Sequence, residues 1–155
     1  MPAIAYGELP SLCVAGKRLE YRRIAGDPDR ATIVLLHEGL GCVALWRDFP
    51  ERLAEATGNS VFAYSRAGYG GSTPISLPPP LDYMSREATD ILPHVTRAAG
   101  ITDYILPGHS DGAGIAPVHA RTQPDGHAAT HALAPNLFPA ACSLGAIRPA
   151  DRAPS

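Results

Sequence analysis

An unbroken run of apolar residues, ATIVLLH at positions 31–37, constrains the fold of this chain more than any other stretch. A strand with one face in water alternates apolar and polar residues, whereas a strand covered on both faces is apolar throughout. We therefore predict a central parallel strand here. Such a strand needs helices on both faces of its sheet, which restricts the chain to an α/β architecture.

The segments around this strand continue an alternation of strands and helices. Two short β-type runs at 11–14 and 18–24 flank the turn-permissive Ala15-Gly16-Lys17 and predict an antiparallel hairpin. Further strands are expected at 60–64 and 103–106, and helices at about 50–57, at 84–100 and from near 111. This order predicts a mostly parallel central sheet with helices on both faces and an N-terminal antiparallel hairpin.

The composition is that of one folded domain. A hydrophobic share of 45% and a charged share of 18% over 155 residues suit a soluble globular protein with a sizeable core. We predict a single domain over residues 1–155, with irregular structure at 1–10 and 142–155. Long aliphatic side chains become sparse after Pro117, where AATHALAP at 128–135 predicts a weak strand. Pro117 itself falls inside the last predicted helix, at a cost of about 3 kcal/mol.

Charge and cysteine content exclude several classes of function. The formal net charge of −2, without any run of Lys and Arg, argues against nucleic acid as a partner. The start of the chain does not resemble a secretory signal, and no apolar stretch is long enough for a membrane span, so a cytoplasmic protein is expected. Three cysteines without CxxC spacing, and a pair of histidines at 127 and 131 without a nearby HExxH glutamate, predict no metal and no cofactor.

The motif with the clearest chemical meaning is GHSDG at 108–112, which fits G-x-S-x-G between a predicted strand and a predicted helix start. In that context Ser110 occupies a strained turn that exposes its hydroxyl as a nucleophile. Because Asp111 begins the helix, its backbone N–H is expected to stabilise an oxyanion. Five residues with two glycines also arise by chance, so the motif needs support from the rest of the chain.

That support comes from the loop after the apolar strand. A serine hydrolase needs a second oxyanion donor from such a loop, and LLHEGLG at 35–41 is suited to supply it. The backbone of Gly39 is the predicted donor, with Leu40 as the alternative. Leu40 and His109 stand beside the predicted donors and are predicted to contact the substrate.

Three motifs in this order, LLHEGLG, YSRAGYGGS at 64–72 and GHSDG, resemble the N-terminal part of small bacterial serine hydrolases of the α/β-hydrolase superfamily, over roughly residues 11–140. The resemblance implies an incomplete α/β-hydrolase fold. It also implies hydrolysis of an ester, thioester or related small acyl substrate through Ser110. The second motif has Ser65 where the superfamily commonly has Asp, and we interpret its loop as structural.

The resemblance further implies a triad in the chain order Ser, acid, His, with the histidine after the last strand. No acid or histidine after Ser110 has that context; the residues considered are Asp111, Asp125, Asp151, His109, His119, His127 and His131. We therefore interpret the chain as a C-terminally truncated domain whose newly exposed sheet edge favours self-association. A catalytically inactive fragment, or a pseudoenzyme that still binds acyl ligands, is the alternative hypothesis.

A minor alternative is a Rossmann-like domain that binds NADP. The residues from Gly39 to Ala44 fit G-x-G-x-x-G/A after a buried strand. However, the predicted helix start at Asp48-Phe49-Pro50 lies several residues beyond these glycines. The acid expected about twenty residues on is replaced by Tyr64, Ser65 and Arg66, of which Arg66 would suit a 2′-phosphate.

Overall fold

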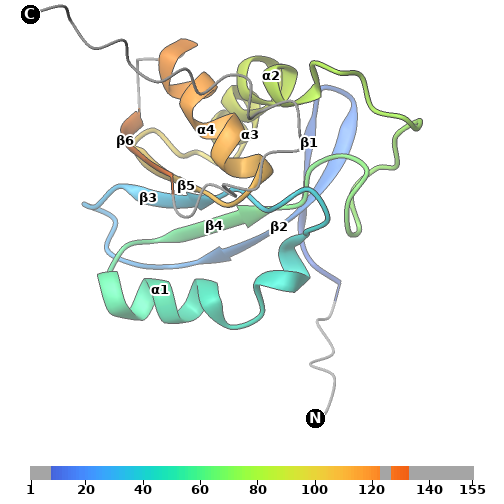
Figure 1. Ribbon diagram of the computed structural model, residues 1–155. Helices are drawn as coiled ribbons and strands as arrows, with labels where there is room; N and C mark the ends of the chain where they lie inside the picture. Colours follow the sequence, from blue (N-terminus) through green and yellow to red (C-terminus); the bar gives the residue numbers. More distant parts are fainter. Residues whose placement is uncertain (1–7, 123–126, 133–155) are drawn as a thin grey trace, which may run out of the picture.

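One mixed sheet organises the part of the chain that the computed structural model describes, residues 8–122 and 127–132. Its strand order is β1-β2-β4-β3-β5-β6 (Figure 1). The strands are β1 (Ser11–Val14), β2 (Lys17–Ile24), β3 (Thr32–Leu35), β4 (Val61–Tyr64), β5 (Tyr104–Gly108) and β6 (His127–Ala132). The β1–β2 and β2–β4 pairs are antiparallel, whereas β3 pairs in parallel with both β4 and β5, and β5 with β6.

Helices cover both faces of this sheet. Helix α1 (Phe49–Thr57) packs on one face, and α2 (Tyr83–Arg86), α3 (Leu92–Ala98) and α4 (Asp111–Thr122) lie on the other (Figure 1). A π-helical segment, η2 (Glu87–Ile91), joins α2 to α3. Pro93 explains this wider turn, because proline has no N–H and its ring crowds the carbonyl four residues earlier in an α-helix.

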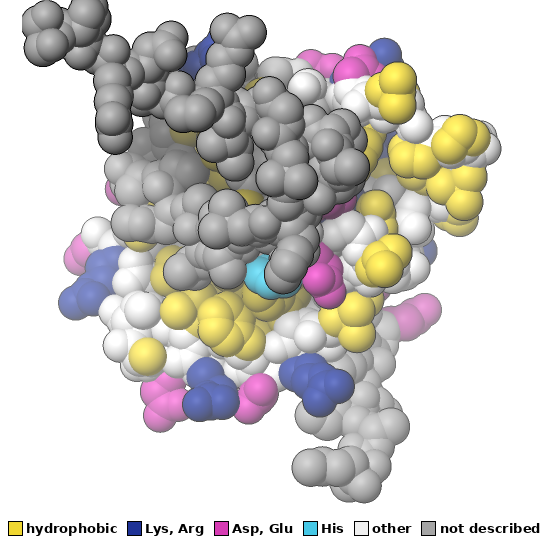
Figure 2. All heavy atoms as spheres, in the orientation of Figure 1, with side chains coloured by type: hydrophobic (Ala, Val, Ile, Leu, Met, Phe, Trp, Pro, Cys, Tyr) yellow, Lys and Arg dark blue, Asp and Glu magenta, His cyan; other side chains and the backbone are white. Residues whose placement is uncertain are grey.

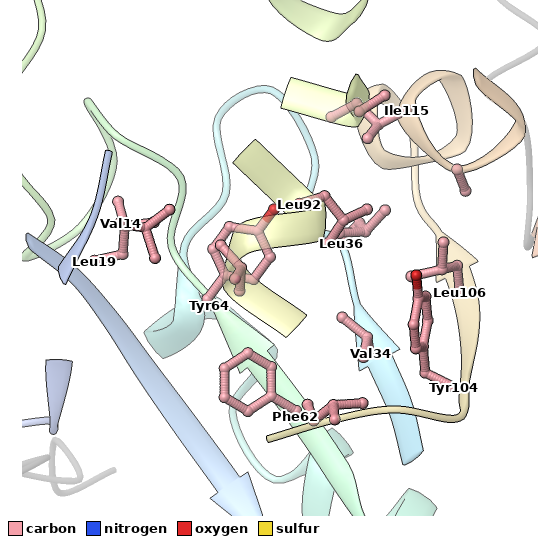
Figure 3. Close-up of a cluster of buried hydrophobic side chains, with 14 residues drawn as sticks. Val14, Leu19, Val34, Leu36, Phe62, Tyr64, Leu92, Tyr104, Leu106 and Ile115 are labelled. Carbon is pink, nitrogen blue, oxygen red and sulfur yellow. The ribbon is translucent and has the colours of Figure 1, made fainter. Parts of the chain in front are cut away.

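Alternation along the central strands divides the core into two clusters. Val34 and Leu36 face the α3 and α4 side, where they pack with Phe62, Leu106 and Ile115 (Figure 3). The side chains between them, Ile33 and Leu35, join the smaller cluster beneath α1, with Val43, Ala54, Val61 and Ala63. The strand that is apolar throughout is therefore covered on both faces, as its sequence predicts.

The predicted strands and helices are confirmed, with differences at their ends. The central strand is shorter than predicted and ends at Leu35, because the backbone beyond it turns away to form a loop. Helix α4 continues through Pro117 to Thr122, so this proline does not end it. The weak strand is β6, which begins at His127, while the predicted irregular ends lie mostly outside the described residues. None of the described helices has the length and apolar character to cross a membrane.

The core assignment is tested by truncating one buried leucine and one exposed leucine. Leu106 is fully buried, so Leu106→Ala is expected to lower the free energy of unfolding by about 2–5 kcal/mol. The matched change Leu81→Ala removes a fully exposed side chain and is expected to cost less than about 0.5 kcal/mol. Urea unfolding of both variants measures the difference, and similar losses would contradict the core described here.

Candidate active site

Ser110 lies in a strained turn between a strand and a helix. Strand β5 ends at Gly108, α4 begins at Asp111, and Ser110 between them has a φ of 54°, in the left-handed region that residues with a Cβ rarely adopt. The two glycines of the motif are needed for packing. A Cβ at Gly108 would overlap the carbonyl of Gly112, and a Cβ at Gly112 would overlap the carbonyl of Leu36.

The loop after β3, residues 37–41, lies against this turn. Leu36 and Gly108 form an isolated parallel bridge, which brings the ends of β3 and β5 together. Gly39 sits so close to Asp111 that a Cβ on it would be 2.7 Å from the carboxylate oxygen Oδ2. Within the described residues, the backbone N–H groups of Gly39, Leu40 and Asp111 donate to no acceptor. The predicted oxyanion donors are therefore neighbours, and their N–H groups are free to bind a ligand.

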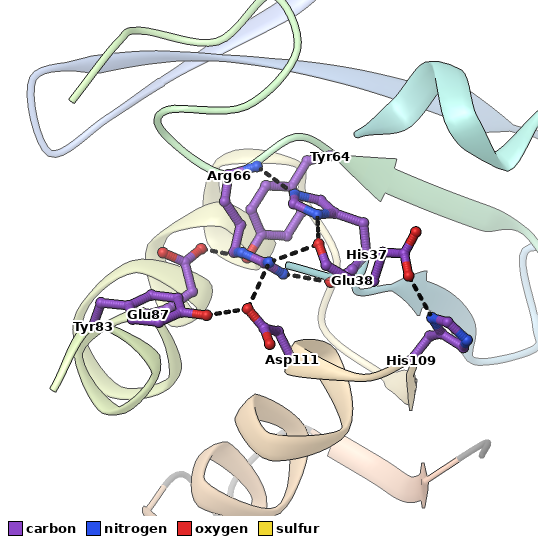
Figure 4. A network of polar contacts seen from close by, with 8 residues as sticks. All are labelled: His37, Glu38, Tyr64, Arg66, Tyr83, Glu87, His109 and Asp111. Carbon is purple, nitrogen blue, oxygen red and sulfur yellow. Dashed lines mark hydrogen bonds and ion pairs between the residues drawn. The ribbon is translucent and has the colours of Figure 1, made fainter. Parts of the chain in front are cut away.

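A buried arginine holds this loop in place. Arg66 follows β4 and is only 2% exposed. Its guanidinium donates to the carbonyl of His37 at 2.7 Å and to that of Glu38 at 3.1 Å (Figure 4). It also lies 3.8 Å from the carboxylate of Asp111. One side chain thus joins the loop after β3 to the first residue of α4.

The imidazole of His37 completes the attachment of the loop. Its Nε2 accepts a hydrogen bond from the backbone N–H of Arg66 at 3.0 Å, and its Nδ1 lies 2.6 Å from the carbonyl of Glu38. Nδ1 therefore carries the proton of a neutral ring. Burial, and then the nearby Arg66 charge, lowers the pKa of His37 to about 3. With both nitrogens engaged and little tendency to protonate, His37 supports the loop and is not a general base.

Two hydrogen bonds from tyrosine hydroxyls to carboxylates connect the site to the helices on the same face. The hydroxyl of Tyr83 donates to the Asp111 carboxylate, and burial followed by this bond raises the pKa of Tyr83. The hydroxyl of Tyr64 donates to Glu87 at 2.8 Å (Figure 4). Burial raises the pKa of the Glu87 carboxyl. These bonds fix the start of α4 and the end of β4 against the segment from α2 to η2.

Neither His109, which precedes Ser110, nor His119, which follows it, forms a hydrogen bond with Ser110 in the described structure. His119 is fully buried, with its ring nitrogens against the Tyr104 hydroxyl at 2.6 Å and the Ala88 carbonyl at 2.7 Å. His109 is half-exposed and faces Glu38, with 3.7 Å between Nδ1 and Oε2. The side chains of His127 and His131 lie outside the described residues, as do Asp125 and Asp151.

A cavity of about 180 Å³ opens beside the loop and the turn. It is lined by His37, Glu38, Gly41, Cys42, Leu45, Trp46 and His109. Of the two residues predicted to contact substrate, His109 lines it, whereas Leu40 is 90% exposed on the loop and does not. A second cavity of about 440 Å³ lies on the other side of Arg66 and includes Tyr69, Tyr83 and Glu87. In the described part of the chain, no three His, Cys, Asp or Glu side chains are placed to hold a metal ion.

The surface around the site is partly apolar. The exposed large hydrophobic side chains come from two segments, one after β3 and one after β4: Leu40, Leu45 and Phe49, and Leu77, Leu81 and Met84. Figure 2 shows hydrophobic side chains gathered over the proline-rich segment and α2. Both segments leave the sheet at the carboxyl ends of β3 and β4, the edge at which Ser110 follows β5.

The structure contradicts the NADP-binding alternative. The glycines after β3 do not open a helix. They lead into a single 3-10 turn, η1 (Val43–Trp46), and α1 begins only at Phe49. The glycines therefore do not open the helix that follows them, as the pyrophosphate site of a Rossmann fold requires. Arg66, the residue considered for the 2′-phosphate, is buried against the loop carbonyls.

The sequence did not reveal the supporting residues. Arg66 belonged to a motif interpreted as structural, but its contact with Asp111 depends on β4 and β5 lying on either side of β3. His37 belonged to LLHEGLG and Tyr83 followed the proline-rich segment, but neither pattern predicted the contacts that these two residues make.

Solved structures of enzymes share the fold of this chain. A predicted CIB-like hydrolase from Thermoplasma acidophilum is 20% identical, with a TM-score of 0.64 over 80% of this chain and 63% of that chain. Carboxylesterase CesB from Bacillus subtilis is 19% identical, with a TM-score of 0.66 over 83% and 43%. Proline iminopeptidase from Mycobacterium smegmatis is 23% identical, with a TM-score of 0.64 over 79% and 42%. The chain thus spans about two fifths to three fifths of their lengths. No family model and no curated protein matches the sequence.

The strain at Ser110 is measurable without any assay of activity. Glycine adopts a positive φ without a Cβ penalty, whereas alanine keeps that penalty. Ser110→Gly is therefore expected to be more stable to denaturant than Ser110→Ala by about 1 kcal/mol. Equal stability of the two variants would show that the turn is relaxed.

The neutral state of His37 gives a pH-dependent stability. Between pH 6.5 and about 3 the unfolded histidine binds a proton that the folded one does not, so acidification favours unfolding. Relative to His37→Gln, the parent chain is expected to lose about 2 kcal/mol of stability between pH 7 and about pH 5. Chemical unfolding of both proteins at the two pH values measures this difference. If both proteins lost the same stability between these pH values, a neutral His37 with a lowered pKa would be contradicted.

Proposed function

Because the chain has the fold of the N-terminal part of an α/β-hydrolase, we propose that it carries the nucleophile of a serine hydrolase that acts on an ester, thioester or related acyl substrate. One observation carries the proposal: Ser110 stands at φ 54° between β5 and α4, beside backbone N–H groups of Asp111 and Gly39 that have no acceptor among the described residues. Strain of this kind persists where the surrounding structure enforces it, and it clusters at reactive sites.

The chemistry that these groups support is acyl transfer. The Ser110 hydroxyl oxygen attacks the substrate carbonyl, a base takes its proton, and the carbonyl oxygen becomes an oxyanion. The N–H groups of Asp111 and Gly39 stabilise that charge, an effect worth about 10²–10³ in rate for each donor. Collapse of this intermediate expels the alcohol or thiol and leaves an acyl group on Ser110, which water then removes.

Full turnover also needs a histidine base and a carboxylate that orients it. Among the described histidines, His37 and His119 use both ring nitrogens elsewhere, and His109 faces Glu38. This observation favours a second candidate function, a chain that binds or slowly accepts an acyl group without turning it over. An oxyanion hole without a full triad retains some catalysis, so the two candidates differ in rate and not in the site used.

Labelling with a fluorophosphonate tests the nucleophile. We expect intact-mass analysis to show one phosphonyl adduct on the folded chain, with peptide mapping placing it on Ser110, because the probe reacts with a serine beside an oxyanion hole. Ser110→Ala is expected to show no adduct, and so is the parent chain unfolded in urea. An unlabelled parent, or a label that persists in Ser110→Ala, would sink the proposal.

Turnover distinguishes the two candidates. Hydrolysis of a p-nitrophenyl ester by the parent chain is compared with hydrolysis by Ser110→Ala. A parent rate above that of the variant supports the hydrolase. Equal rates from a chain that the fluorophosphonate nevertheless labels favour the acyl-binding protein.

A further inference from the structure

The cavity beside the loop after β3 combines apolar walls with one carboxylate, that of Glu38. Leu45 and Trp46 form its apolar walls, and the charged or titratable groups there are His37, Glu38, Cys42 and His109. His37 is neutral and fully hydrogen-bonded to backbone. The polar character of the cavity therefore depends on Glu38 and His109, which enter it from the loop and from the turn that holds Ser110.

The carboxylate of Glu38 is available to a ligand. It is 48% exposed, and its one contact in the described residues is His109 at 3.7 Å, which is an ion pair only when the imidazole is protonated. The backbone carbonyl of Glu38 accepts a hydrogen bond from Arg66. The charge of Arg66, however, lies beside the Asp111 carboxylate at 3.8 Å and does not pair with the Glu38 side chain. Gly41 leaves room for the Glu38 stem, since a Cβ there would lie 3.1 Å from Cγ. The cavity thus presents a carboxylate whose charge is not neutralised.

Trp46 adds a second attraction for positive charge. Its ring stacks on Phe49 at 5.5 Å between centroids, which fixes the orientation of the indole. Indole attracts cations through its π face, and this attraction adds to that of a nearby carboxylate. The volume of about 180 Å³ is comparable with that of an apolar cavity of about 150 Å³ that holds benzene.

We propose that this cavity binds a compact organic ammonium group, with the positive charge at Glu38 and the hydrocarbon against Trp46 and Leu45. One consequence rests on the proposed function: the acyl compounds that Ser110 attacks carry an amino group close to the reacting carbonyl. The binding itself does not depend on Ser110 chemistry. The two claims can therefore fail separately.

Trp46 is the only tryptophan in the chain, so its fluorescence reports on the cavity directly. The full chain is titrated at about pH 8 with benzylammonium and with benzyl alcohol, since an ordinary imidazole is then neutral and a primary amine still charged. Both ligands are expected to change the Trp46 emission, and the ammonium is expected to bind about fivefold more tightly.

Three variants give this result its meaning. Glu38→Gln removes the charge at nearly constant size, so it should abolish the preference for ammonium while benzyl alcohol still binds. Glu55→Gln, the same change on an exposed position of α1, should keep the preference. Leu45→Phe narrows the cavity without changing its charge, so it should lower the affinity for both ligands equally. That result would confirm where they bind.

The proposal is overturned if the two ligands bind the parent equally, if neither changes the Trp46 emission, or if Glu38→Gln keeps the preference. Failure of the proposed function would appear elsewhere, as a Ser110 that no fluorophosphonate labels while the ammonium titration succeeds. A labelled Ser110 without any ammonium preference would leave the nucleophile in place and remove only the inference about the amine.

Discussion

The guanidinium of Arg66 connects the three chain segments that make the candidate site. Arg66 follows β4, its carbonyl partners follow β3, and Asp111 begins the helix after β5. A buried cation costs free energy unless acceptors and an opposite charge compensate for its lost hydration. Here the loop carbonyls and Asp111 compensate the two terminal nitrogens, while Nε has no hydrogen-bond partner among the described residues. The position of the oxyanion loop relative to Ser110 therefore depends on keeping this one charge satisfied.

The backbone at Ser110 is strained, and the surrounding structure holds it in that conformation. Ser110 is held at a positive φ by glycines that let β5, α4 and the end of β3 approach more closely than any side chain would allow. His37 contributes by remaining neutral, because a charged imidazole could not accept the Arg66 backbone N–H. Loop and turn are thus shaped before any substrate arrives, which is what stabilisation of a developing oxyanion requires.

Glu38 contributes both to this support and to the lining of the neighbouring cavity. Its carbonyl is an acceptor for Arg66, while its carboxylate enters the cavity beside His109. The residue that helps to hold the loop after β3 therefore also places a carboxylate beside the cavity. Exposed hydrophobic side chains also lie in the segments that follow β3 and β4.

Local patterns in the sequence were sufficient for the elements and for the identity of the candidate nucleophile. The apolar run before His37, the helical spacing from Tyr83 to Ala98 and GHSDG each act through neighbours in the chain, and the strands, helices and turn formed where those patterns predicted. What the sequence could not give was the partnership of Arg66, His37, Tyr83 and Asp111, or the cavity under Trp46. Those contacts exist because β3 lies between β4 and β5 in the sheet, which brings loops far apart in the chain to one edge. The spacing of residues along the chain does not show which loops come together in space, so only the tertiary structure decided these contacts.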